Sequence, residues 1–135
     1  MKHAAIAIML AAAAVLSAAG PASAADVGGA WTKTTHSDPE NVTVFFSEGK
    51  TVKAIGYGRI GGGPAIWHAE GRFAGGALEL SYHYSSDATP PGWEPDGTMR
   101  LTLSADGKTL SGTATSKSGN WSGRVEFKRA FLSRR

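Results

Sequence analysis

Apolar and polar residues alternate with a period of two over most of the chain beyond residue 29. These segments are rich in β-branched and aromatic residues, and none shows the i, i+3, i+4, i+7 apolar spacing of an amphipathic helix. The pattern predicts eight strands, at residues 30–36, 41–47, 51–60, 65–73, 77–85, 98–104, 109–116 and 121–131. The sequence therefore indicates an all-β protein.

The connections between these strands are of two kinds. Tight hairpin turns, in which glycine tolerates a positive φ, are expected at Glu48–Lys50, Gly75-Gly76 and Asp106-Gly107. Looser connections are expected at residues 37–40, 61–64, 86–97 and 117–120. In an up-and-down order, alternate connections lie at the same end of the sheet. We therefore expect one end with tight turns and one end that carries loops.

Eight sequential antiparallel strands can close into a barrel, which leaves no edge strand exposed. A two-sheet β-sandwich is the alternative arrangement. The succession of tight hairpins favours a single eight-stranded antiparallel up-and-down β-barrel. At this strand number the interior holds either side chains alone or one small ligand.

The turn positions also predict the register of the strands. A two-residue loop at Gly75-Gly76 places Trp67 opposite Tyr84 on an apolar face, and His68 opposite His83 on a polar face. This pairing is self-consistent, because apolar residues meet apolar residues along its whole length.

The turn at Glu48–Lys50 is expected to be a three-residue bulged turn. It would place Phe46 opposite Val52 and Val44 opposite Ala54. Ala54 is one of several small residues at expected interior positions, which are Ala54, Gly56, Gly58, Ala69, Gly71, Gly112, Ala114 and Gly123. Glycine weakens a strand, so such a set indicates either room for a ligand or tight coiling around aromatic rings. We favour filling by aromatic rings, from Trp67, Trp121, Phe73, Tyr82 and Tyr84.

Arg129 shares the parity of the apolar residues in the last strand, which places its charge on the inner face. Such an arginine needs a polar partner or a ring to lie on. Trp31 opens the first strand, and closure of a barrel brings the first and last strands together. We therefore expect Arg129 to pack on Trp31.

The stretch Gly29-Ala30-Trp31 resembles the G-x-W start of lipocalins and related calycin barrels. Avidin-type barrels are similar in size and layout. In the calycin superfamily the tryptophan closes the bottom of the barrel and packs against an arginine late in the last strand. The resemblance implies that Trp31 and Arg129 close the barrel here, and that the open end binds a small ligand.

His68, His83 and Glu70 form the one candidate metal site. Directly opposed histidines are close enough to share a metal ion, and Glu70 could supply a third ligand. These residues alternate with the better apolar set, so we expect them to face outward as a paired polar ladder. We expect no cofactor.

His36, Ser37 and Asp38 are the residue types of a catalytic triad, but they are adjacent in one loop. Catalysis needs a base that separate elements orient. We expect a turn at these residues and a protein that is not an enzyme.

The loop at residues 87–97 contains three prolines and Trp93, and loops of this length are often functional. The chain is expected to be a non-catalytic binding protein for a small apolar or aromatic ligand, contacted by Trp93, Trp67, Tyr82 and Tyr84. The alternative is a protein-interaction module, or an inhibitor of an exported enzyme, that acts through the 87–97 loop.

Residues 1–24 have the form of a bacterial secretory signal peptide, with cleavage expected after Ala24. Residues 25–135 would then be a single barrel domain, periplasmic or secreted, without a membrane span. The chain has no cysteine, which excludes disulfides and thiolate metal sites. Without Lys2 there are 13 basic and 11 acidic residues, a balance too mild to indicate a nucleic-acid partner.

Overall fold

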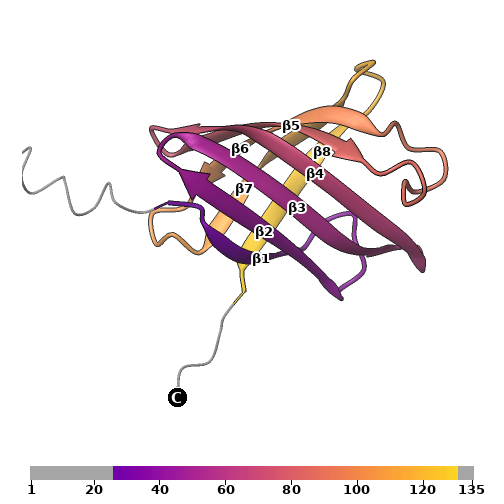
Figure 1. The fold of residues 1–135 in the computed structure, drawn as a ribbon, viewed down its shortest axis with the longest axis horizontal. Coiled ribbons are helices and arrows are strands. Elements are labelled where there is room, and N and C mark those ends of the chain that lie inside the picture. Colours follow the sequence, from indigo (N-terminus) through magenta and orange to yellow (C-terminus); the bar gives the residue numbers. More distant parts are fainter. Residues whose placement is uncertain (1–25, 131–135) are drawn as a thin grey trace, which may run out of the picture.

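The computed structural model describes residues 26–130, so the expected signal peptide lies outside the described residues. The strands are β1 (Gly29–Lys33), β2 (Asn41–Glu48), β3 (Thr51–Ile60), β4 (Gly63–Ala74), β5 (Ala77–Tyr84), β6 (Asp96–Leu103), β7 (Thr109–Ser116) and β8 (Ser122–Arg129). Each pairs antiparallel with the next, and β1 pairs with β8 (Figure 1). The sheet therefore closes into one eight-stranded antiparallel barrel, which confirms the predicted fold over the β-sandwich.

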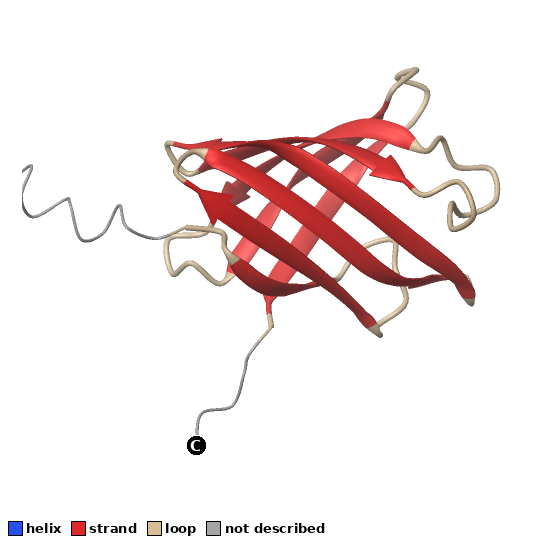
Figure 2. Ribbon diagram, viewed as in Figure 1, coloured by secondary structure: helices blue, strands red, loops and turns tan. Residues whose placement is uncertain are grey.

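The described residues are organised as strands and connecting turns or loops (Figure 2). Within residues 26–130 there is no helix long and apolar enough to cross a membrane. The turns β2–β3, β4–β5 and β6–β7 lie at one end of the barrel, and the loops β1–β2, β5–β6 and β7–β8 lie at the other (Figure 1).

The β3–β4 connection is tighter than the sequence predicted. Ile60 pairs with Gly63 and Arg59 pairs with Pro64, so the turn consists of Gly61 and Gly62 alone. Both glycines have a positive φ, of 60° and 84°, which is the conformation that a two-residue hairpin requires. The expected loop at residues 61–64 was therefore wrong, because Gly63 and Pro64 belong to β4.

The register between β2 and β3 also differs from the expectation. Phe45 pairs with Ala54 and Ser47 pairs with Val52, because the turn consists of two residues and has no bulge. A shift of one residue moves every side chain of a strand to the opposite face. Phe45 is accordingly 1% exposed and Phe46 is 56% exposed, so the prediction that placed Phe46 opposite Val52 was wrong.

The core at the turn-bearing end is built around Trp31, which is fully buried. The Trp31 ring meets Phe45 edge-on, with a centroid distance of 6.1 Å, and Phe45 meets Phe127 at 5.8 Å. Trp31 pairs with Arg129 across the β1–β8 seam, and the guanidinium carbon lies 4.3 Å from the centroid of the Trp31 ring. The contact that strand parity predicted is therefore present.

The charge of Arg129 is satisfied by backbone carbonyls. Its guanidinium donates to the carbonyl oxygen of Gly107 at 3.0 Å, of Gly28 at 2.8 Å and of Asp26 at 2.8 Å. These bonds join the β6–β7 turn to the segment that precedes β1. Arg129 thus ties the first and last strands together at the end where the barrel is packed.

Two of the interior glycines allow the strands to coil tightly. A Cβ atom at Gly71 would lie 1.7 Å from the carbonyl oxygen of Glu79, and one at Gly112 would lie 1.9 Å from that of Arg100. No side chain fits there without moving the backbone of the neighbouring strand. These glycines are therefore required by the sheet geometry.

Two others make room for aromatic rings of the protein itself. A Cβ atom at Gly56 would lie 2.1 Å from the Trp67 ring, and one at Gly97 would lie 2.3 Å from the hydroxyl of Tyr82. These four glycines therefore fit the second of the two expected reasons, tight coiling of the strands around aromatic rings. Filling is complete at the turn-bearing end and incomplete at the loop-bearing end.

Candidate functional site

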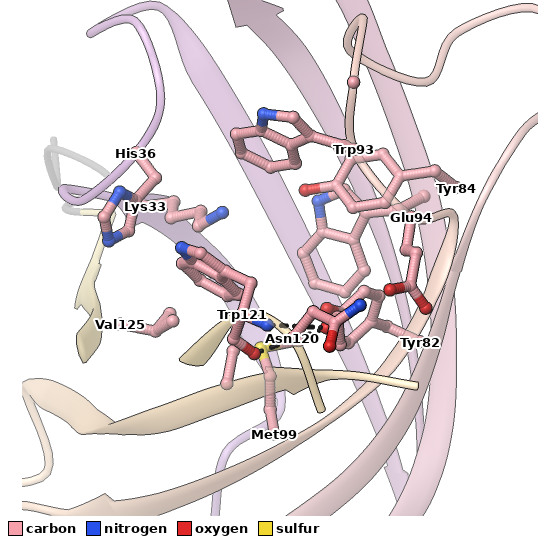
Figure 3. Close-up of a pocket in the computed structure, with 14 residues that line it drawn as sticks. Lys33, His36, Tyr82, Tyr84, Trp93, Glu94, Met99, Asn120, Trp121 and Val125 are labelled. Carbon is pink, nitrogen blue, oxygen red and sulfur yellow. Dashed lines mark hydrogen bonds between the residues drawn. The ribbon is translucent and has the colours of Figure 1, made fainter. Parts of the chain in front are cut away.

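A cavity of about 450 Å³ lies at the loop-bearing end of the barrel (Figure 3). Its volume is within the range of small-molecule sites, roughly 300–1,000 Å³. The side chains that line it come from β1, β4 to β8 and the loops above them. All four residues that the sequence predicted as ligand contacts are among them, namely Trp67, Tyr82, Tyr84 and Trp93.

The wall of this cavity is a continuous series of aromatic rings. Tyr82 meets Tyr84 edge-on at a centroid distance of 5.9 Å, and Tyr84 meets Trp93 in the same way at 5.8 Å. Trp93 is stacked on Trp121, with 6.4 Å between the centroids and 21° between the ring planes. Such a surface offers flat apolar contacts, and the tyrosine hydroxyls add polar ones.

The parity of Trp121 with Val125 predicted that its ring fills the barrel interior. In the structure it does not. It is 41% exposed and lies at the rim of the cavity, next to Trp93 (Figure 3). The reason is that β8 begins at Ser122, so residue 121 precedes the pleated strand. The sequence analysis therefore counted Trp121 among the rings that fill the interior and missed its place in the cavity wall.

The loop between β5 and β6 is held against the barrel by backbone hydrogen bonds. The amide of Ile66 donates to the carbonyl of Ala88 at 3.1 Å, and the amide of Ser85 donates to the carbonyl of Ile66 at 2.8 Å. Ala88 is buried. These contacts fix the base of the loop, so that Trp93 is positioned over the mouth with 36% of its surface exposed.

Glu94 connects the β5–β6 loop to the β7–β8 loop. Its carboxylate accepts a hydrogen bond from the amide of Ser118 at 3.0 Å and another from the Ser118 hydroxyl. These bonds lower the pKa of Glu94 below its ordinary value. The two loops that carry Trp93 and Trp121 are thereby held together, which maintains the stacking of the two rings.

Protonation of Glu94 should break the connection between the two loops only below about pH 4.5. The hydrogen bonds favour the ionised carboxylate, so their contribution is complete above the ordinary pKa of 4.5 and is lost as pH falls through the lower pKa of the folded protein. The near-ultraviolet circular dichroism of the stacked tryptophans should stay constant down to about pH 4.5 and change below it. Glu94→Gln should lack this transition. A change that begins above pH 4.5 in the unmodified protein would contradict the role of Glu94.

Lys33 is the cationic residue of the cavity, and the sequence analysis missed it. Its backbone is fixed by Asn41, whose side chain accepts from the Lys33 amide at 2.7 Å and donates to the Lys33 carbonyl at 2.9 Å. Lys33 lies two residues after Trp31 and therefore shares its inward direction. Strand parity was the signal that could have found it.

Burial changes the acid–base behaviour of three cavity residues. It lowers the pKa of the Lys33 ammonium group to about 8. It raises the pKa of the Tyr84 hydroxyl and that of Tyr82, and for Tyr82 the carboxylates of Glu94 and Asp96 add to the effect. Both tyrosines are therefore neutral donors at physiological pH.

His36, Ser37 and Asp38 are held by different backbone groups. The Nε2 atom of His36 lies 3.1 Å from the carbonyl oxygen of Arg124, and the ring lines the cavity. The Asp38 carboxylate accepts from the amides of the 61–62 turn at 3.3 and 3.1 Å. The structure places these residues in an irregular connection between β1 and β2, with His36 as an additional cavity residue.

His68 and His83 face outward on neighbouring strands, with their ring centroids 5.4 Å apart. The Nδ1 atom of His83 lies 2.6 Å from the Asp96 carboxylate, so its acidic neighbour is Asp96 and not Glu70. In the part of the chain from 26 to 130, no group of three or more histidine or acidic side chains is placed to hold a metal ion.

The described chain is thus a closed antiparallel barrel that is packed at one end and hollow at the other, with a cavity walled by aromatic rings. Comparisons with protein families, curated proteins and solved structures found no match to this chain. What the cavity can bind follows from its own side chains.

Proposed function

We propose that the protein is an exported, non-catalytic, calycin-like binding protein that holds a small apolar or aromatic molecule at the loop-bearing end. The observation that carries this proposal is the cavity of about 450 Å³ with Trp67, Tyr82, Tyr84 and Trp93 in its wall. The packing of Arg129 on a buried Trp31 supports the calycin-like part of it.

The aromatic wall supports a ligand of this class for two physical reasons. Rings bury a large apolar area in a defined geometry, and the tyrosine hydroxyls can orient a bound molecule. The hydrogen bonds at Ile66 and Glu94 hold the loops in place before a ligand arrives. A site that is already ordered loses less entropy on binding.

Native mass spectrometry of protein purified gently from its own host tests the proposal. We expect a retained small molecule, seen as a mass above that of the chain and released on denaturation. A mass equal to that of the chain alone, together with failure to bind an apolar dye such as phenylnaphthylamine, would contradict the carrier function.

Trp93→Ala should abolish ligand binding and leave stability nearly unchanged. Trp93 closes one side of the cavity but is 36% exposed, so its removal should change the free energy of unfolding by about 1 kcal/mol or less. Dye titration and urea denaturation measure the two effects. Tyr57→Ala is the matched control, because Tyr57 is 63% exposed and does not line the cavity. A large loss of stability in Trp93→Ala would identify Trp93 as a plug instead of a ligand contact.

A second candidate is a protein-interaction module, or an inhibitor of an exported enzyme, that acts through the 87–97 loop. It is favoured by the exposure of Trp93 at 36% and of Trp121 at 41%, because exposed tryptophans in an ordered loop are typical interface hot spots. A one-to-one complex with an exported enzyme that is lost in Trp93→Ala, in a protein that retains no small molecule, would favour this role over the carrier.

A further inference from the structure

Lys33 is the last residue of β1, and its side chain extends into the cavity toward the tryptophan pair (Figure 3). Its Nζ atom lies 6.0 Å from the centroid of the Trp93 ring. None of the ion pairs among residues 26–130 involves Lys33, and its ammonium group has no hydrogen bond there. A positive charge thus lies in an aromatic cavity without an anionic partner among these residues.

The other titratable groups that line the cavity are His36, Tyr82, Tyr84 and Glu94. Both tyrosines are neutral, and the Glu94 carboxylate is occupied by the two hydrogen bonds from Ser118. The strands on either side of Lys33 present no carboxylate to it. On β8 its pairing partner is Phe127, and from β2 the side chain of Asn41 bonds its backbone.

We propose that the natural ligand is a planar aromatic anion, such as an aromatic carboxylate, whose charge pairs with Lys33 while its rings contact Trp93, Tyr84 and Trp67. The inference rests on the proposed carrier function and specifies the chemistry of its ligand. The aromatic rings would hold many flat apolar molecules, and Lys33 would select those that carry a negative charge.

Electrostatics supports this selection. A partly desolvated ammonium group is unfavourable unless a negative charge compensates for it. The lowered pKa of Lys33 is a consequence of this desolvation and is consistent with the geometry. An anion bound beside Lys33 would stabilise the protonated form, and the two charges would attract more strongly than in bulk water because burial partly desolvates Lys33.

A matched pair of dyes tests the inference. Anilinonaphthalene sulfonate and phenylnaphthylamine share the same fused aromatic system and amine-linked ring, but only the first carries an anionic group. Fluorescence titration gives the dissociation constant of each dye for the unmodified protein. Binding that disappears in Trp93→Ala is assigned to the cavity. We expect the sulfonate dye to bind about tenfold more tightly or better.

Substitution of Lys33 separates charge from shape. Lys33→Met keeps a long apolar side chain and should weaken the sulfonate dye about tenfold or more while leaving the neutral dye within about twofold. Lys33→Arg keeps the positive charge and should therefore retain the preference for the sulfonate dye that Lys33→Met loses. Lys53→Met removes one charge from the exposed outer face of β3, and it should leave both dissociation constants unchanged.

The pH dependence of sulfonate-dye binding gives a further test, because a purely structural role of Lys33 would not produce it. The anion would bind to the protonated state of Lys33, which predominates below a pKa of about 8. Above that pH the sulfonate dye should weaken by up to about tenfold per pH unit, because binding must then take up a proton. The neutral dye and Lys33→Met should show no such dependence. His36→Asn identifies any contribution from the histidine ring.

The outcomes distinguish the two proposals. If both dyes bind equally and Lys33→Met changes neither, the carrier function stands and the inference about an anionic ligand is overturned. If neither dye binds in the cavity, the inference is overturned, and the carrier function fails with it when native mass spectrometry also finds the mass of the chain alone. If Lys33→Met binds neither dye and its unfolding transition is unchanged, Lys33 shapes the cavity and does not select an anionic ligand. That result would overturn the inference.

Discussion

Replacing Trp31 with alanine should lower the free energy of unfolding by about 3–5 kcal/mol, the usual cost of removing a large buried aromatic side chain. Trp31 is fully buried, and its indole N–H donates to the carbonyl of Val27 at 2.9 Å. Its ring contacts Phe45 edge-on, and the Arg129 guanidinium lies over the ring. The substitution therefore removes apolar contacts, a hydrogen bond and a cation–π contact at the β1–β8 seam. Urea denaturation of both proteins measures the difference.

Trp121→Ala is the matched control for this experiment, because it removes the same side chain from the rim. Trp121 is 41% exposed, so the expected cost is about 1 kcal/mol or less. A similarly small cost for Trp31→Ala would contradict its role in closing the barrel. It would also remove the main support for the resemblance to calycin barrels.

Phe45→Ala should also lower the free energy of unfolding by about 3–5 kcal/mol, whereas Phe46→Ala should change it by no more than about 0.5 kcal/mol. The two residues are neighbours in β2 and have the same side chain. Phe45 is 1% exposed and contacts the rings of Trp31 and Phe127, whereas Phe46 is 56% exposed. Only the direction of the side chain differs, so the comparison isolates burial.

This pair of variants also tests the register of β2. The expected three-residue bulged turn at Glu48–Lys50 predicted the opposite face, with Phe46 opposite Val52. Equal costs for the two substitutions, or a larger cost for Phe46→Ala, would restore that register and contradict the pairing of Phe45 with Ala54.

The misassignment of β2 has a physical origin in its composition. Val42, Val44 and Phe46 share one parity, and Thr43 and Phe45 share the other. The first set is the more apolar, but Val42 and Phe46 are exposed while Thr43 and Phe45 are buried. Alternation cannot choose between two faces when both carry apolar residues. The two-residue turn and the pairing with β3 make the choice.

The hairpin between β4 and β5 shows the opposite case. Its turn is an unambiguous glycine pair, and Trp67 meets Tyr84 while His68 meets His83, as the sequence predicted. One face of each strand is clearly apolar and the other is polar. Turn chemistry and alternation therefore agree, and together they determine the register.

The candidate site was partly predictable for the same reason. Trp67, Tyr82 and Tyr84 follow from the inner parity of β4 and β5, and Trp93 follows from its place in a proline-rich loop. Lys33 was missed because a lysine in a short strand is ordinarily solvated. Its parity with Trp31 indicated an inward direction, and the closed barrel shows that the side chain extends toward Trp93.

The amino-acid sequence by itself determined the strands, the Gly75-Gly76 hairpin and the up-and-down order of this protein, because alternation and turn chemistry act between residues close together in the chain. The tertiary structure decided which face of β2 is buried, where Trp121 lies, and that one end of the barrel is hollow. The place of Trp121 and the hollow end depend on contacts between distant segments, such as β1 with β8 and the Trp93 loop with the Trp121 loop. Such contacts form only when the sheet closes, and closure places Lys33 among the aromatic rings of the cavity.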